Sequence, residues 1–176
     1  MEGVEIRSAA SEDFAGWFSL FSEVAAEGKW VGSEAPLDQE ARRERFQRSL
    51  DSADQETFLA HHGGRLIGVL GMELSRGLAE LGMLVDAAWR RRGVGSQLME
   101  TGIAWARERG AHKVVLEVWP HNTAAQALYR KFGFAEEAVL RRHYRRNNGQ
   151  LWDAIGMGLV LDHDSPGSPF TPSSDG

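Results

Sequence analysis

The segment that most constrains the fold is residues 113–118, Lys-Val-Val-Leu-Glu-Val, where apolar side chains fall on both faces of an extended chain. Such a strand is typical of the middle of a sheet that is covered on each side. Amphipathic helices can supply the cover, and one is predicted early in the chain. An aromatic stripe with helical spacing runs from Phe14 to Phe21, after Ser11 as a possible helix cap. The sequence therefore predicts a mixed α/β layer fold.

The remaining elements follow from local signals. Helices are predicted over residues 38–50, 93–109 and 122–132. Strands are predicted over 4–7, 57–61, 66–74, 80–85, 134–142 and 151–161. The three strands between residues 57 and 85 are expected to be consecutive and antiparallel. The last two strands are expected to pair through Asn148 and Gly149, because an Asn-Gly step strongly favours a hairpin turn.

Composition excludes several classes of protein. The chain has 176 residues, of which 42% are hydrophobic and 26% charged, as in ordinary globular proteins. One domain is expected over residues 1–161, followed by a disordered tail over 162–176 that is rich in Ser, Pro, Gly and Asp. A net charge of -5 argues against nucleic acid as the main partner. The absence of cysteine excludes disulfides, thiolate metal sites and an acyl-cysteine intermediate. The acidic start and the lack of a long apolar run predict a cytoplasmic protein with no membrane partner.

The sharpest motif is the run Arg-Arg-Arg-Gly-Val-Gly-Ser at residues 90–96, which follows a strand and opens a helix. Unpaired N–H groups at a helix start bind phosphate oxygens, and glycines let the backbone approach them closely. The alternative is a plain helix start with solvated arginines. A dinucleotide-binding turn fits poorly, because residues 86–92 separate the strand from Gly93 and because Leu98 stands where a third glycine belongs. A Walker loop is excluded, since no Gly-Lys-Ser/Thr follows.

Two motifs together resemble the GNAT superfamily of acyl-CoA N-acetyltransferases. The family hallmark Gln/Arg-x-x-Gly-x-Gly/Ala matches Arg90, Gly93 and Gly95. A second hallmark, Asn-x-x-Ala-x-x-Leu-Tyr-x-x-x-Gly-Phe, is matched by Asn122, Ala125, Leu128, Tyr129, Gly133 and Phe134. The resemblance covers residues 4–160. It implies a central mixed, mostly antiparallel sheet of about seven strands flanked by about four helices, with two strands splayed to form a cleft for CoA.

The resemblance also implies roles for particular residues. The backbone of residues 83–85 would pair with the pantetheine arm of acetyl-CoA, and amides of residues 91–96 would hold its pyrophosphate. Tyr129 would give a proton to the departing CoA thiolate. The implied residues for binding acetyl-CoA are Met83, Leu84, Val85, Arg90, Arg91, Arg92, Gly93, Val94, Gly95, Ser96, Asn122, Ala125 and Tyr129.

Amide formation also needs a base that removes a proton from the amine, and two carboxylates compete for this role. Glu117 lies inside the apolar strand 113–118, where burial would strengthen it as a base. Glu80 opens the preceding strand, where other family members carry theirs. We expect the acceptor pocket to involve Trp30, in the loop 28–36, and Tyr144, in the last hairpin.

Three questions stay open at this point. The acceptor can be a small-molecule amine or amino acid, or instead a protein N-terminus or lysine, and the chain can alternatively be a CoA-binding sensor without turnover. The basic cluster 141–146 can contact an acidic substrate or RNA, although such charges more often protect a solvated hairpin. No metal is expected, because His61 and His62 point to opposite faces of one strand. Assembly as a homodimer also stays open.

Overall fold

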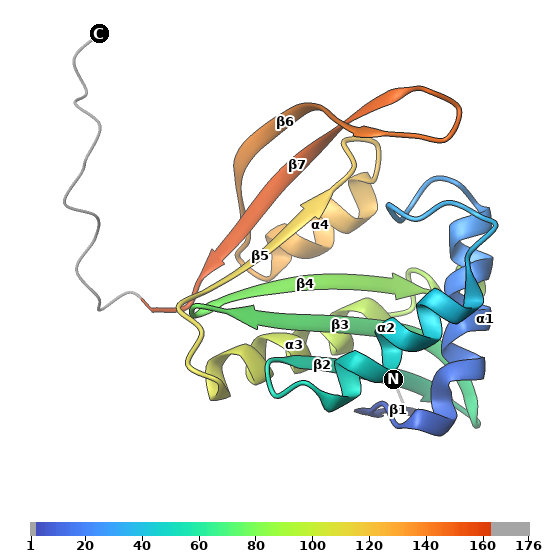
Figure 1. Ribbon diagram of the computed structural model, residues 1–176. Helices are drawn as coiled ribbons and strands as arrows, with labels where there is room; N and C mark the ends of the chain where they lie inside the picture. Colours follow the sequence, from blue (N-terminus) through green and yellow to red (C-terminus); the bar gives the residue numbers. More distant parts are fainter. Residues whose placement is uncertain (1–2, 163–176) are drawn as a thin grey trace, which may run out of the picture.

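A computed structural model describes residues 3–162, so nearly all of the predicted tail lies outside the described residues. One seven-stranded sheet forms the centre of the molecule (Figure 1). Its strands are β1 (Val4–Ser8), β2 (Gln55–His62), β3 (Arg65–Ser75), β4 (Leu78–Val85), β5 (Lys113–Val118), β6 (Ala135–Arg145) and β7 (Leu151–Val160). The helices are α1 (Phe14–Ala26), α2 (Gln39–Asp51), α3 (Val94–Glu108) and α4 (Thr123–Lys131), with short 3₁₀ turns at Ser11–Asp13 and Ala87–Trp89.

The sheet has the order β1-β2-β3-β4-β5-β7-β6 and is antiparallel except between β4 and β5. The prediction of three consecutive antiparallel strands is confirmed by β2, β3 and β4. The predicted hairpin between the last two strands is confirmed as well, with Gly149 in a turn at φ +85°. The architecture is therefore the mixed, mostly antiparallel α/β sheet with four helices that the sequence predicts.

The helices cover the sheet on both faces. On one face α3 packs on β3 and β4, and its residues Val94, Leu98, Gly102 and Trp105 are all buried. The other face is covered by α1 and α2, where Leu20 and Val24 of α1 pack against Leu59, Val69 and Leu84. Alternation along a strand sends successive side chains to these two layers, so each strand of the meander contributes to both cores.

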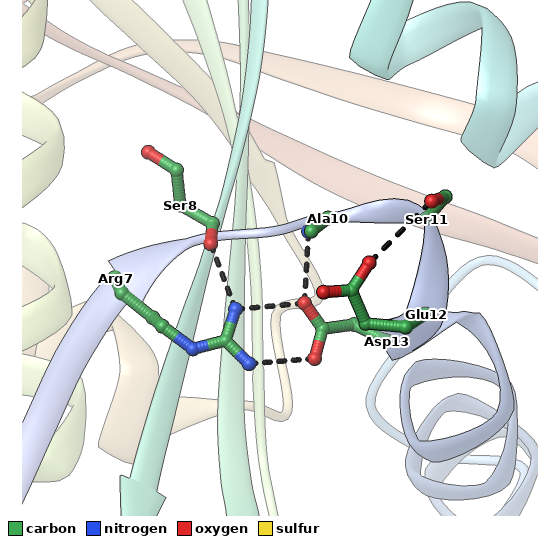
Figure 2. A network of polar contacts seen from close by, with 6 residues as sticks. All are labelled: Arg7, Ser8, Ala10, Ser11, Glu12 and Asp13. Carbon is green, nitrogen blue, oxygen red and sulfur yellow. Dashed lines mark hydrogen bonds and ion pairs between the residues drawn. The ribbon is translucent and has the colours of Figure 1, made fainter.

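The junction between β1 and α1 differs from the prediction in one detail (Figure 2). Ser11 does not cap α1, because it begins a 3₁₀ turn and its hydroxyl donates to Glu12 at 3.4 Å. Asp13 holds the N-cap position of α1, but its side chain points back along the chain: its Oδ2 accepts from the Ala10 N–H at 2.8 Å, and both its oxygens accept from the Arg7 guanidinium at 2.6 and 2.7 Å. A bidentate pair of this kind fixes the angle at which the chain enters the helix.

β4 and β5 part soon after they meet, which Figure 1 shows as a widening gap between the two arrows. Their parallel pairing runs only from Leu78–Lys113 to Glu80–Val115. This parting corrects the prediction that 113–118 is covered on both faces. Val114, Leu116 and Val118 are buried on one face, but Glu117 on the other face is exposed, because that face borders the gap.

Candidate active site

The gap between β4 and β5 continues into a cleft of about 1100 Å³. Its walls come from elements far apart in the sequence: α1, α2 and the loop between them, β4 and the turn that follows it, the start of α3, the end of β5, and α4. The strand-end parting therefore opens the sheet where four helices and two loops converge. Most residues singled out in the sequence lie along this cleft, and they fall into three groups.

The first group is the glycine-rich turn at the start of α3. Arg91 and Gly93 have positive φ angles of +62° and +82°, which give the turn a concave backbone. The N–H groups of Ser96 and Gln97 both donate to the Gly93 carbonyl, at 3.0 and 3.2 Å. The N–H groups of Val94 and Gly95 come before them and have no acceptor within the helix. The turn thus presents backbone donors at the positive end of the α3 dipole.

The three arginines of this turn have different partners. Arg90 turns back to Glu27, at the end of α1, where its Nη1 donates to Oε2 at 2.7 Å, and its Nε donates to the Val85 carbonyl at 3.0 Å. The guanidinium of Arg92 lies over the Trp89 ring, 5.4 Å from its centroid. Arg91 is exposed, lines the cleft and forms no ion pair within residues 3–162. Of the three, Arg91 is the one whose charge faces the cleft without a protein counterion.

Glu27 was not singled out by the sequence. The hydrogen bond from Arg90 holds the pKa of Glu27 below its usual range, although partial burial opposes this, and a second hydrogen bond from the Trp30 Nε1 at 2.6 Å adds to it. Trp30 is half-buried and lines the cleft, and its ring lies 5.5 Å from the Arg90 guanidinium. Residue 90 is distant in the sequence from residues 27 and 30, and only the folded structure brings the three together.

The second group lies on α4. Asn122 caps this helix, since its Oδ1 accepts from the Ala125 N–H at 3.2 Å, and both residues line the cleft. Tyr129 follows two turns later, is buried to 7% exposure and also lines the cleft. Burial raises the pKa of Tyr129 to about 12, because the phenolate would lose its hydration. The hydroxyl is therefore held in its protonated form beside the gap.

The third group is a cluster of two carboxylates and a tyrosine. The Tyr144 hydroxyl donates a hydrogen bond to Glu117, and Glu80 is close enough to raise the pKa of Tyr144 as well. The structure thus brings together both candidate bases, from β4 and β5, with a residue from the last hairpin. The expectation that Glu117 is buried is wrong, since it is exposed at the edge of the gap.

A bulge in β6 places Tyr144 in this cluster. Leu140 pairs with Ala154 and Tyr144 with Trp152, so β6 has three residues opposite the single residue Asp153. Arg142, inside the bulge, has φ +52°, and its N–H donates to Asp153 Oδ1 at 2.7 Å. A bulge of this kind re-aims the side chains that follow it.

Aromatic side chains close the cleft beyond Tyr144. Trp119 contacts Tyr144 and Trp152 edge to face, with centroids 5.0 and 5.3 Å apart, and His121 contacts both Trp152 and Trp30. Sequence reasoning missed Trp119, His121 and Trp152, although the first two directly follow a buried strand that ends at the gap. Their position after that strand is the signal that could have identified them.

Arg146 corrects the expectation that the cluster 141–146 is simply solvated. Its side chain is buried, stacks over Trp152 at 4.4 Å, and donates from Nη1 to the Gly32 carbonyl at 2.9 Å. Glu34 lies 3.5 Å from its Nε, and the carboxylate of Glu34 also accepts from the Asn147 N–H at 2.8 Å. Arg146 therefore ties the last hairpin to the loop between α1 and α2, whereas Arg141, Arg142 and Arg145 are exposed.

Within residues 3–162 no three His, Asp or Glu side chains are grouped as a metal site would need. In the same part of the chain, no helix combines the length and the apolar character needed to cross a bilayer.

Residues 16–134 match the model of the Acetyltransferase (GNAT) family. The [Ribosomal protein bS18]-alanine N-acetyltransferase of Escherichia coli (strain K12) is 40% identical over 77 residues, which are 44% of this chain and 51% of that protein. The L-amino acid N-acetyltransferase AaaT of the same strain is 34% identical over 87 residues, 47% of this chain and 51% of that protein. An acetyltransferase of GNAT family from Streptococcus pneumoniae has a similar structure, with a TM-score of 0.80, 26% identity, and coverage of 90% of this chain and 99% of that one. In the two sequence matches to Escherichia coli proteins, the chain spans about half the length of the curated relatives.

The two tyrosines give the site a measurable titration, because the chain contains no others. Burial is the main cause that raises the pKa of both Tyr129 and Tyr144 to about 12, from an ordinary value of 10.0. Folding favours the neutral phenols, so this contribution to stability is complete below pH 10.0 and declines as the pH rises toward 12. We expect the ultraviolet absorbance of native protein to show no phenolate until well above pH 10.0.

The urea-unfolded protein, titrated in parallel, should show both tyrosines near their ordinary value. Tyr129→Phe and Tyr144→Phe each leave a single tyrosine to assign. A native titration that coincides with the unfolded one would contradict the burial of Tyr129 and the partly buried, hydrogen-bonded placement of Tyr144.

Proposed function

The chain belongs to the GNAT acetyltransferase family, because residues 16–134 match its model, and on that premise we propose that it transfers the acetyl group of acetyl-CoA directly to a primary amine in a ternary complex. The observation that carries this proposal is the convergence, on one cleft, of a phosphate-type glycine turn, a protonated tyrosine and two carboxylates. The family relationship supplies the reaction class, and this chain's own residues supply the roles below.

Acetyl-CoA fits the α3 side of the cleft. Its pyrophosphate would accept from the N–H groups of the turn at residues 91–96, with Arg91 as the cation nearest the cleft. Its pantetheine amides would pair with the backbone of β4 at Met83, Leu84 and Val85, because beyond Glu80 this strand has no neighbour on the β5 side. The Val85 carbonyl already accepts from Arg90, so that pairing rests mainly on the residues before it.

The amine must lose a proton before its nitrogen attacks the thioester carbon. Glu117 or Glu80 would take that proton, directly or through water, since both border the gap next to Tyr144. The new C–N bond forms, the C–S bond breaks, and the CoA sulfur receives a proton. Tyr129 is placed to give it, because it lines the cleft and its hydroxyl is protonated at neutral pH. Asn122 and Ala125, on the same helix, would line the thioester side of the cleft.

Two classes of acceptor fit the proposal, a protein N-terminus and a free amino acid, because the curated relatives act, by their names, on the alanine of a ribosomal protein and on L-amino acids. Trp30 and Tyr144 both line the cleft, which supports their proposed place in the acceptor pocket. Purified protein should release free CoA from acetyl-CoA only when an accepting amine or peptide is present. CoA binding without release across a broad panel would indicate the non-catalytic sensor instead.

Gly95→Glu should weaken CoA binding. Gly95 is the second residue of α3, and an added Cβ there would meet Leu128 Cδ2 at 3.1 Å, which a leucine tip can accommodate. Gly95→Glu puts a carboxylate among the phosphate donors, so we expect the calorimetric CoA Kd to rise by about 10-fold or more, the cost of opposing one charged contact. Ala104→Glu, on the exposed face of the same helix, is the matched control and should bind as wild type.

Tyr129→Phe removes the proposed acid and leaves the ring in place. We expect kcat to fall by roughly 10 to 10⁴-fold, the range typical of a lost general acid, while the CoA Kd stays close to that of wild type. The loss should be smaller with an acyl donor whose thiol is a better leaving group, because such a thiol needs less help from an acid. An equal loss for both donors would argue against the acid role.

The two carboxylates can be separated by their pH dependence. Only the true base should, when changed to Gln, remove the acidic limb of the pH–rate profile, where the rate climbs as the base ionises. Alkaline buffer should partly rescue that variant, because it deprotonates the amine without help. We expect this for one of Glu117→Gln and Glu80→Gln. Wild-type rates and pH profiles in both variants would show that neither residue is the base.

A further inference from the structure

On the face of the sheet that α1 and α2 cover, the cleft has a second chamber to which no role has been given. We propose that this chamber binds a carboxylate of the acceptor against Arg42 and Arg45 of α2, so that the enzyme acts on aminocarboxylates. The inference rests on the acetyl transfer proposed above and extends it to the class of acceptor. Its three supports are a floor of small residues, two cations without counterions and two carboxylates without cations, all judged within residues 3–162.

The floor of the chamber is a row of small residues. Thr57 of β2, Gly71 of β3 and Gly82 of β4 lie side by side in register across three strands. They face α1 and α2, because Val69 and Leu84, two residues away on the same strands, pack against Leu20 and Val24. A Cβ added at Gly82 would meet nothing within 4 Å, and one at Gly71 would meet only the Gly82 carbonyl at 3.9 Å.

The backbone does not require these glycines. Neither has a positive φ, so other residues could adopt the same conformation. Glycine weakens a strand interior and often marks a place where a ligand approaches the backbone closely. Two glycines paired on adjacent central strands, with open space above them, therefore indicate room kept for a ligand.

The roof of the chamber is one face of α2, from which Arg42, Arg45 and Ser49 line the cleft. Arg42 is half-buried, donates from Nη2 to Ser33 Oγ at 2.7 Å, and lies 4.8 Å from the Phe21 ring centroid. Neither arginine forms an ion pair with any residue in the described part of the chain. Burial, with a smaller effect from Arg45, lowers the pKa of Arg42, which is the signature of a cation that lacks a partner.

The third support is a pair of carboxylates next to the glycine floor. Glu73 of β3 and Glu80 of β4 lie directly opposite each other, on the same face as Gly71 and Gly82, and both line the cleft. Like charges in directly opposed positions destabilise a sheet. No Lys or Arg within residues 3–162 forms a salt bridge to either of them, so a cation from the substrate would relieve their repulsion.

The chamber therefore has opposite charges on opposite walls, with carboxylates on the sheet and guanidinium groups on α2. An acceptor with an amine at one end and a carboxylate at the other matches both walls. Its amine would lie at Glu80, beside the gap where the thioester is placed, and its carboxylate would reach Arg42 and Arg45. A simple amine carries no carboxylate, so it would lack the contact with Arg42 and Arg45.

The test compares L-amino acids with their carboxamides as acceptors, with aminoalkylphosphonates as a further arm that distinguishes a phosphate-type anion. We expect Arg42→Gln to lower the ratio of kcat/KM for the carboxylate over the carboxamide by about 10-fold or more, as for one lost charged hydrogen bond. Because the amines' intrinsic reactivity is the same for every variant, the change in ratio reports the site alone. Arg48→Gln, on the same helix but outside the cleft, is the matched control and should keep the wild-type ratio.

A second variant tests the floor. Gly82→Val places a branched side chain in the open space and suits a strand, so the fold should survive. We expect the acceptor KM to rise by about 10-fold while the calorimetric Kd for CoA stays within about 2-fold. An unchanged ratio in Arg42→Gln, a phosphonate preferred over the carboxylate, or an unchanged acceptor KM in Gly82→Val each overturns the inference alone. CoA binding without transfer to any acceptor overturns the proposed function with it.

Discussion

The structure depends on one constraint, which is that β4 and β5 are hydrogen-bonded over only three residue pairs. Up to Glu80 and Val115 the two strands hold one continuous sheet together, and past that point each keeps a neighbour on its other side alone. An unpaired strand edge inside a protein must be covered or matched by another hydrogen-bonding group. The parting therefore makes room for a ligand and also supplies backbone groups that a ligand with amides can satisfy.

The parted strands need walls that hold their positions, and long-range polar contacts provide them. The loop over residues 27–38 is held at four places: by Arg90 on Glu27, by the contact of 2.8 Å between His121 Nε2 and the Lys29 carbonyl, by Arg42 on Ser33, and by Arg146 on Gly32 and Glu34. Arg146 is buried, and its Nη2 has no hydrogen-bond partner among the described residues. A buried N–H group without a partner costs free energy, and the stacking of the guanidinium on Trp152 offsets part of that cost. These contacts connect the acceptor side of the cleft to the same turn that opens α3.

Local signals in the sequence were enough to predict most of the fold. The Asn-Gly step and the spacing of the α4 motif each act over a few residues, and each predicted helix and strand is present. The exposure of Glu117 could not be predicted in this way, because it follows from the departure of a strand that lies elsewhere in the sequence. The same holds for Arg146, which looks like one of several surface arginines until the loop at Gly32 is placed against it. The motif identifies the residues of the glycine turn. Which of its arginines faces the cleft without a partner depends on the contacts of the other two with Glu27 and Trp89.

β4 has two different faces, which would suit the two ligands proposed above. Its odd-numbered side chains, Ala79, Leu81, Met83 and Val85, pack toward α3, which carries the glycine turn. Its even-numbered positions face α1 and α2, and there the pattern is Glu80, Gly82 and Leu84, a carboxylate, a hollow and a core residue. A larger residue at position 82 would strengthen the strand and join the core around Leu84. With glycine at this position, the floor of the proposed chamber and the open edge of the sheet belong to the same stretch of β4, so ligands at the two proposed sites would be neighbours.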